Sequence, residues 1–141
     1  MPDIVATPKL TAAGAARIMA AAIVKAAAMG VPQCIAIVDD GGNLLAFRRM
    51  DGAKLLSIRT CQRKAYTAVF NRARSGTVSR ELALELALVT QGKFVNLKGA
   101  APIMVDGKVI GAIGVGSGTG EQDLEVALAG IAALPGASSG G

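Results

Sequence analysis

The sequence has no histidine and no tryptophan among its 141 residues. Histidine is the usual proton-transfer group near neutral pH and a frequent metal ligand, so its absence excludes Ser-His-Asp catalysis, histidine-ligated haem and most zinc sites. Lysine, tyrosine, cysteine, aspartate and glutamate remain as groups that could transfer protons. Aromatic residues make up only 3% of the chain, which predicts a core packed from small aliphatic side chains.

Cysteine is also scarce, with Cys34 and Cys61 standing apart in the chain and outside any Cys-x-x-Cys motif. This spacing predicts two free, buried thiols in a reducing compartment, with no metal site and no redox pair. The N-terminus lacks the charged and apolar regions of a signal peptide, and the apolar stretch 12–29 is interrupted by Arg17 and Lys25. We therefore expect a cytoplasmic protein without a membrane span.

The net charge of +5 comes from 15 basic and 10 acidic residues spread along the chain. No basic helix with interleaved aromatic residues is present, so we expect no nucleic-acid partner. A small carboxylated organic ligand accounts for the excess of positive charge equally well. The positive mean hydropathy predicts a homo-oligomer, because monomers rarely leave large apolar patches in water.

The length of 141 residues predicts one domain, over residues 1–134, and the Gly/Ser-rich composition of 135–141 predicts a flexible tail. The expected fold class is α+β, with an antiparallel sheet of about five strands flanked by helices. The expected helices are 12–29, 54–70, 80–90 and 121–134, and the expected strands are 34–38, 44–49, 94–97, 102–105 and 109–115.

The segment 102–123 combines a hairpin, a glycine loop and a helix start. Asp106-Gly107 between apolar runs predicts a type I′ turn. A glycine loop lets backbone approach a ligand, and the helix that follows favours an anion at its N-terminus, where Thr119 and Gln122 form a capping-box pattern. An ordinary turn explains the glycines as well, because their spacing matches neither nucleotide-binding motif. The candidate binding residues here are Gly116, Ser117, Gly118 and Thr119.

Arginine is the natural anchor for a carboxylate because its planar guanidinium donates two parallel hydrogen bonds. Arg48 and Arg49 are neighbours on an expected strand, so they point to opposite faces and only one can reach a pocket. The sequence does not decide which one, and each could equally be a solvated surface residue.

Candidate catalytic groups are Lys64, Tyr66, Glu121 and Asp123. Lys64 and Tyr66 are two positions apart on a helix and do not share a face, so at most one of them enters a site. Glu121 and Asp123 border the glycine loop and could activate water, although helix capping explains both equally well.

Four segments, read together and in order, resemble the GlcG/HbpS family, which includes the C-terminal domain of PduO-type proteins. The segments are IAIVDDGGNLLAFRRMDGA from Ile35, KAYTA from Lys64, GAAPI from Gly99 and DGKVIGAIGVGSGTGEQD from Asp106. They correspond to a strand-turn-strand followed by R-M-D-G-A, a helix segment, a G-G-x-P-I loop and a glycine-rich end. The match spans about residues 10–134.

This resemblance implies a profilin-like fold that assembles as dimers or larger rings, up to octamers, with a small-molecule pocket near a subunit interface. By the same resemblance, Asp51, Gly99 and Pro102 are candidate binding residues. Family roles include haem or tetrapyrrole binding and sensing, corrinoid-related functions, and reactions of carboxylated ring-cleavage products. Asn43 stands where many members have histidine, which argues against haem held by a histidine.

The leading hypothesis from the sequence is a catabolic enzyme acting on a small unsaturated carboxylate of the muconate type. It would add water with elimination, as in hydrolytic dehalogenation, and would need no cofactor. The alternative is a non-catalytic module that binds haem, another tetrapyrrole or a small metabolite, without histidine ligation of any haem iron. A structural oligomer without a ligand is the third hypothesis.

Overall fold

Four helices and four strands make up the described part of the chain, residues 1–140 of a computed structural model. The helices resemble the expected ones closely, and the sheet has one strand fewer than expected. In chain order the elements are α1 (Ala12–Met29), β1 (Cys34–Asp39), β2 (Leu44–Arg49), α2 (Leu56–Asn71), α3 (Arg80–Val89), β3 (Ala100–Val105), β4 (Lys108–Gly116) and α4 (Gly120–Ala132).

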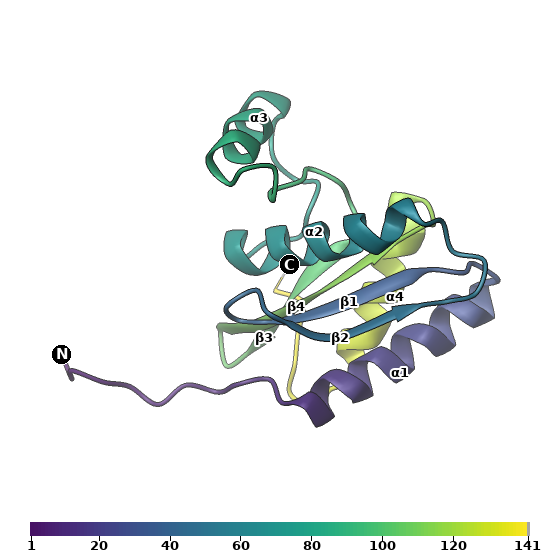
Figure 1. Cartoon of the computed structure of the whole chain (residues 1–141). Helices are drawn as coiled ribbons and strands as arrows, with labels where there is room; N and C mark the ends of the chain where they lie inside the picture. The colour runs from purple at the N-terminus through teal and green to yellow at the C-terminus, as the bar shows by residue number, and fades with distance from the viewer. Residues whose placement is uncertain (141) are drawn as a thin grey trace.

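The sheet is antiparallel throughout, with strand order β2-β1-β4-β3. Helices α1 and α4 lie side by side on one face of the sheet and α2 covers the other, while α3 stands apart above α2 (Figure 1). Asp106 and Gly107 both have positive φ, 51° and 75°, which confirms the expected turn between β3 and β4. The α+β fold class is therefore confirmed.

The expected edge strand at 94–97 is wrong, and this segment is irregular. The Val95 N–H donates to Oγ1 of Thr67 on α2 at 2.9 Å, so it is not available to a neighbouring strand. The Asn96 side chain bonds the backbone of Val78, and Phe94 is buried beneath α3. We call the part of the chain between α2 and β3, which carries α3, the α3 arm. The segment 94–97 therefore fixes the base of this arm and does not extend the sheet.

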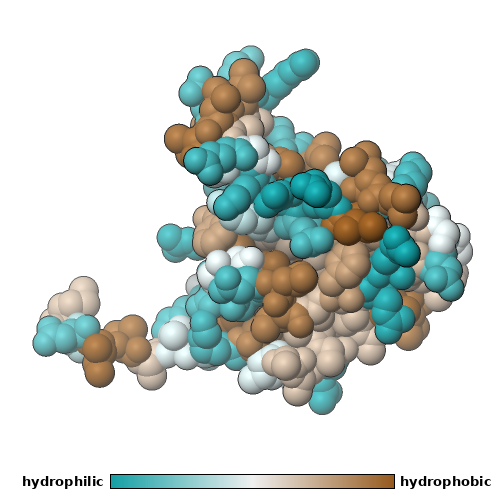
Figure 2. All heavy atoms as spheres, viewed as in Figure 1, coloured by the Kyte–Doolittle hydropathy of each residue, from teal (hydrophilic) through white to brown (hydrophobic). Residues whose placement is uncertain are grey.

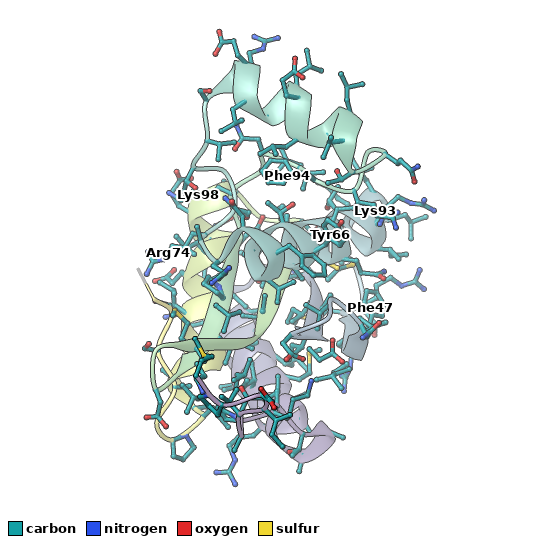
Figure 3. The ribbon with its side chains drawn as sticks, turned by 90° about the vertical axis from the view of Figure 1, so that its left-hand side faces the viewer. Phe47, Tyr66, Arg74, Lys93, Phe94 and Lys98 are labelled. Carbon is teal, nitrogen blue, oxygen red and sulfur yellow. The ribbon has the colours of Figure 1, made fainter. Side chains whose placement is uncertain are left out.

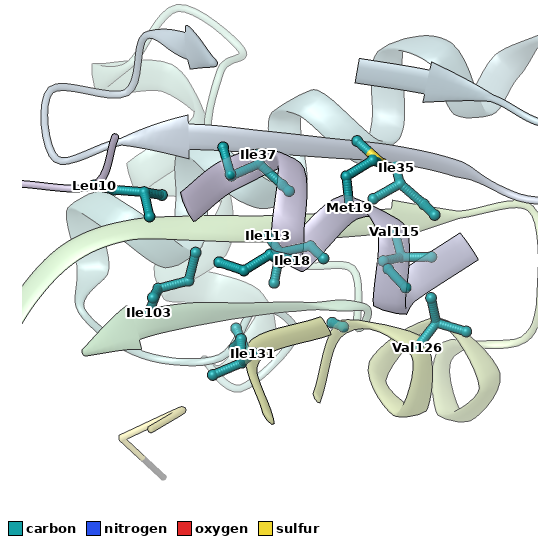
Figure 4. Close-up of a cluster of buried hydrophobic side chains, with 14 of the residues drawn as sticks. Leu10, Ile18, Met19, Ile35, Ile37, Ile103, Ile113, Val115, Val126 and Ile131 are labelled. Atoms are coloured by element: carbon teal, nitrogen blue, oxygen red, sulfur yellow. The ribbon is translucent and has the colours of Figure 1, made fainter. Parts of the chain in front are cut away.

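The main core lies between the sheet and the α1/α4 layer and is built from isoleucine, valine, leucine, methionine and alanine, as the composition predicts (Figure 4). On the opposite face, smaller clusters pack under α2. Gly114 is needed there, because a Cβ at this position would lie 2.1 Å from the Cys61 carbonyl oxygen of α2. The small residues of β4 thus let α2 approach the sheet closely.

Helix α1 begins and ends where the sequence predicts. The Thr11 hydroxyl accepts a hydrogen bond from the Gly14 N–H, and Gly30 ends the helix with φ 70°. By length and composition alone, α1 meets the criteria for a membrane span, which is weak evidence because core helices of soluble proteins meet them too. In the fold, one side of α1 is buried, including Ala15, Ile18 and Ala22.

The C-terminal tail, whose flexibility stays a prediction, makes contacts with two other parts of the chain. Ser138 and Met104 exchange two backbone hydrogen bonds of 2.9 Å, and Arg74 donates to the Ser139 hydroxyl at 2.9 Å. The tail is thereby attached to β3 at Ser138 and to the connection between α2 and α3 at Ser139. Gly141, the last residue of the expected tail, lies outside the described residues.

Candidate functional site

A buried polar network joins three elements beneath the glycine loop, residues 116–120. Lys64 of α2 donates from Nζ to Asp123 Oδ2 at 3.0 Å and to the Val115 carbonyl oxygen at 2.9 Å. The other carboxylate oxygen of Asp123 accepts from Gln33 Nε2 at 2.7 Å and from the Gly118 N–H at 2.9 Å. Lys64, Asp123 and Gln33 are all buried. The structure therefore brings together two predicted site residues, Lys64 and Asp123, and adds Gln33.

Two positions around this network require glycine, because neighbouring atoms lie too close to leave room for a Cβ. Gly99 has φ 137°, and a Cβ there would lie 2.9 Å from Lys64 Nζ and 2.7 Å from the Val115 carbonyl oxygen. A Cβ at Gly118 would lie 2.9 Å from both Asp123 Oδ1 and Gln33 Nε2. Gly99 and Gly118, both predicted as binding residues, thus line the buried ion pair.

Most polar groups of the glycine loop are used within the chain. Ser117, with φ 91°, accepts a hydrogen bond from the Lys54 N–H at its Oγ. Thr119 and Gln122 form the capping box that the sequence predicts. At Gly116, a Cβ would lie 3.1 Å from the Ser57 Cβ, so this glycine lets α2 approach the end of β4. The hydrogen bonds and close contacts of the loop hold α2 and α4 against the sheet.

The two acids that border the loop have different surroundings. Asp123 is 2% exposed and accepts from three donors, which leaves its carboxylate little access to a substrate water. Glu121 is exposed and pairs with Lys98 at 3.4 Å. A hydrogen bond from its own backbone N–H, together with Lys98, lowers the pKa of Glu121. A carboxylate with a lowered pKa is a weaker base for activating water.

The pairing of β1 with β2 decides which way each arginine points. Arg49 pairs with Cys34 and Arg48 with Ile35, and directly paired residues project from the same face of a sheet. Cys34 belongs to the cluster under α2, whereas Ile35 belongs to the core under α1 and α4. Arg49 is therefore on the α2 side and Arg48 on the α1 side, and both side chains are exposed.

A surface groove of about 260 Å³ runs along the outer side of α2. We call it the α2 groove; its lining residues are Ile58, Arg59, Gln62 and Arg63. Ile58 packs against the same cluster as Cys34 and Ala36, whose β2 partners are Arg49 and Phe47. Phe47 and Arg49 therefore project from the same side of the sheet as the groove, although neither is one of its lining residues.

The remaining predicted site residues lie apart from the buried network. Tyr66 packs edge-on against Phe70 with ring centroids 4.7 Å apart, and in Figure 3 it lies between Phe47 and the arm that carries Lys93 and Phe94. Asp51 lines a separate shallow groove near the end of α1. Pro102 is buried in β3 opposite Ala112. Tyr66 and Pro102 are on the α2 side of the sheet, since Ala112, the partner of Pro102, packs in the cluster under α2.

Both thiols are buried, as the sequence predicts, and no disulfide joins them. Burial, together with a smaller effect of the neighbouring Cys34, raises the pKa of Cys61 to about 12. Burial likewise raises the pKa of Cys34. Neither group supplies a thiolate ligand near neutral pH. Among residues 1–140 no group of three or more His, Cys, Asp or Glu side chains could hold a metal ion.

The inertness of these thiols can be measured by alkylation. With iodoacetamide at pH 8, we expect Cys61 in the folded protein to react on the order of a thousandfold more slowly than in the denatured chain, because only the thiolate reacts. Mass spectrometry of quenched samples gives both rates. Similar rates in the folded and denatured protein would contradict the buried, high-pKa thiol.

Comparisons with known proteins show the family to which the chain belongs. Residues 10–132 match the family model described as haem degrading protein HbpS-like. A 15.0 kDa uncharacterized protein from the dhaT-dhaS intergenic region of Citrobacter freundii is 39% identical over 121 residues, which cover 81% of this chain and 84% of that protein.

Two crystal structures extend the match to the whole fold. A PduOC–haem complex is 29% identical with a TM-score of 0.85, covering 94% of this chain and 99% of that one. HbpS is 32% identical with a TM-score of 0.83, covering 94% of each chain. As the ordered motifs predict, the chain belongs to the GlcG/HbpS family of haem-degrading HbpS-like proteins.

Proposed function

We propose that this chain is a small-molecule-binding protein whose ligand is a planar, carboxylated ring of the tetrapyrrole class. The support from relatives is the family itself and a solved structure of similar fold that holds haem. The observation on this chain that carries the proposal is the α2 groove, which is lined by two arginines and Ile58 and has Arg49 on the same side of the sheet.

The chemistry of the groove suits such a ligand. Guanidinium groups bind carboxylates through paired hydrogen bonds, and the propionates of a tetrapyrrole are carboxylates. The ring of Phe47, at the sheet edge, offers a face on which a planar ligand can pack. At about 260 Å³, the groove is smaller than the roughly 300–1,000 Å³ of typical ligand pockets. One chain therefore supplies only part of the enclosure, and we expect a homo-oligomer to complete it.

The residues do not fit a haem iron held by histidine, because the chain has none. The two thiols are buried with raised pKa values and do not offer thiolates in their place. Tyrosine and methionine can also ligate haem iron, but neither lines the α2 groove, so a tetrapyrrole there would be held by its carboxylates and its apolar faces. For this reason we expect the metal-free ring to bind with an affinity similar to that of haemin.

The catalytic hypothesis, water addition and elimination on a muconate-type acid, has less support. It needs a carboxylate that can reach a bound water, and Asp123 is 2% exposed and already accepts hydrogen bonds from three donors of the protein. Glu121 reaches solvent, but its lowered pKa makes it a weak base. The three relatives named above are not described as dehalogenases.

An absorbance titration with haemin, repeated with protoporphyrin, tests the proposal. We expect saturable spectral shifts with both rings. Arg49→Ala is expected to weaken binding about tenfold to a hundredfold, because it removes a charge-assisted hydrogen bond to a propionate. Arg48→Ala is the matched control, since its side chain leaves the sheet on the opposite face.

Three results would count against the proposal. Spectra that never saturate with either ring would remove tetrapyrrole binding. Tight binding of haemin with no binding of protoporphyrin would show that iron ligation, and not the groove chemistry, holds the ring. Equal losses for Arg48→Ala and Arg49→Ala would show that the arginine on the α2 side has no special role.

A further inference from the structure

Helix α3 buries no residue within its own chain, although it is ten residues long. A helix this short is marginal in water unless its apolar face packs against something. Its outward face instead exposes leucine and valine, with exposed fractions between 49% and 78%, at Leu82, Leu84, Leu88 and Val89. Glu81 and Glu85 lie between these residues, one turn apart. We call this surface the α3 face.

A second exposed surface, the α2 stripe, has the opposite charge. Leu55 and Leu56 are 69% and 73% exposed at the start of α2. Arg59 and Arg63 follow along the same side of the helix, one turn apart, as the two glutamates are on α3. Figure 2 shows apolar side chains gathered on the α3 arm and again over the N-terminal end of α2.

None of the four ion pairs among residues 1–140 uses Arg59, Arg63, Glu81 or Glu85. The two surfaces therefore present unpaired charges of opposite sign at matching spacing, each beside exposed leucines. The base of the arm is fixed on α2 through Val95 and Thr67, and the α3 face is exposed in its own chain.

We propose that the α3 face packs on the α2 stripe of a second copy of this chain, with Glu81 and Glu85 opposite Arg63 and Arg59. In a two-fold dimer the contact occurs twice, because each copy offers both surfaces. Four acid–base pairs then surround apolar cores formed by the exposed leucines of both copies. A self-complementary pair of surfaces on one sequence identifies a second copy, and not an unrelated protein, as the partner.

The same contact deepens the proposed function, on which this one step rests. The α2 stripe borders the α2 groove, since Arg59 and Arg63 belong to both. The arm of the second copy therefore forms the missing wall of the ligand site. The glutamates of that arm pair with Arg59 and Arg63. Arg49, at the sheet edge, then remains free to hold the ligand carboxylate.

A charge swap tests the contact. Sedimentation velocity of the full chain, without ligand, is compared for the unchanged protein, for E81R/E85R, for R59E/R63E and for the variant carrying all four changes. We expect each double variant to weaken self-association at least about tenfold, because like charges then face each other. The four-fold variant is expected to recover the assembly, since the charges are complementary again.

Matched reversals elsewhere on the surface provide the control. Glu125→Arg on α4 and Arg17→Glu on α1 change the charge of exposed residues that lie outside both surfaces, and are expected to leave the mass unchanged. Circular dichroism confirms that each variant is folded. An unchanged protein that sediments as a single chain, double variants that keep their mass, or a four-fold variant that stays dissociated would each overturn the proposal.

The experiment is independent of the tetrapyrrole titration. If the charge swap behaves as expected and no ring binds, the contact between copies stands and the proposed ligand falls. If rings bind but the charge swap has no effect on mass, the ligand stands and the α3 contact falls.

Discussion

Replacing Lys64 with methionine is expected to lower the free energy of unfolding by about 3–5 kcal/mol, because it leaves the Asp123 carboxylate buried without its cation. Lys64 is 5% exposed and Asp123 2%, so solvent does not compensate for the lost charge. Chemical denaturation followed by circular dichroism measures the effect. The midpoint should shift strongly, with little change in slope.

The double variant K64M/D123N separates the charge from the packing. Neutralising Asp123 while keeping its shape removes the uncompensated charge, so the double variant should be more stable than Lys64→Met alone. As a control, Lys98→Met breaks the exposed Lys98–Glu121 pair and is expected to leave the free energy of unfolding almost unchanged, because solvent screens this pair. Equal costs at Lys64 and Lys98 would contradict the buried network.

Gly114→Ala is expected to destabilise the protein by about 3 kcal/mol through overpacking. The added Cβ would lie 2.1 Å from the Cys61 carbonyl oxygen and 2.7 Å from the Ala65 backbone nitrogen, and backbone atoms of a helix cannot rotate away. Helix α2 would have to lift from the sheet and carry the Lys64 ammonium with it. Thermal and chemical denaturation both report this loss.

Gly14→Ala on α1 is the matched control for this substitution. The nearest atom to its added Cβ would be the flexible end of the Leu10 side chain, at 3.0 Å, and the other neighbours are at ordinary contact distances of 3.5 Å or more. Alanine is the better helix former, so the stability should stay the same or rise by up to about 1 kcal/mol. If the two alanine variants were equally stable, the tight approach of α2 to β4 would be wrong.

Local signals made much of this fold predictable. Thr11 and Gly30 bracket α1, Asp106-Gly107 turns the hairpin, and Thr119 caps α4, all as expected. These features depend on neighbouring residues, which the sequence displays directly. The segment 94–97 was predicted wrongly because its β-like composition serves a contact with Thr67, 28 residues earlier, instead of a strand partner.

The candidate site was less predictable because it depends on distant partners. Lys64 and Asp123 were each singled out, but they are 59 residues apart and no local pattern pairs them. Gln33 was missed, since a single amide before an apolar strand carries no signal of its own. The face of the sheet from which Arg48 and Arg49 each project depends on strand register, which the sequence does not show. The pairing with Ile35 and Cys34 decides it.

A crystal structure of the chain grown with haemin tests the central proposal most directly. It should show the ring in the α2 groove, with a propionate on Arg49, Phe47 against the ring and α3 of a second copy opposite. A ring bound in another groove, or one whose carboxylates contact neither Arg49 nor the residues of the α2 groove, would contradict the account.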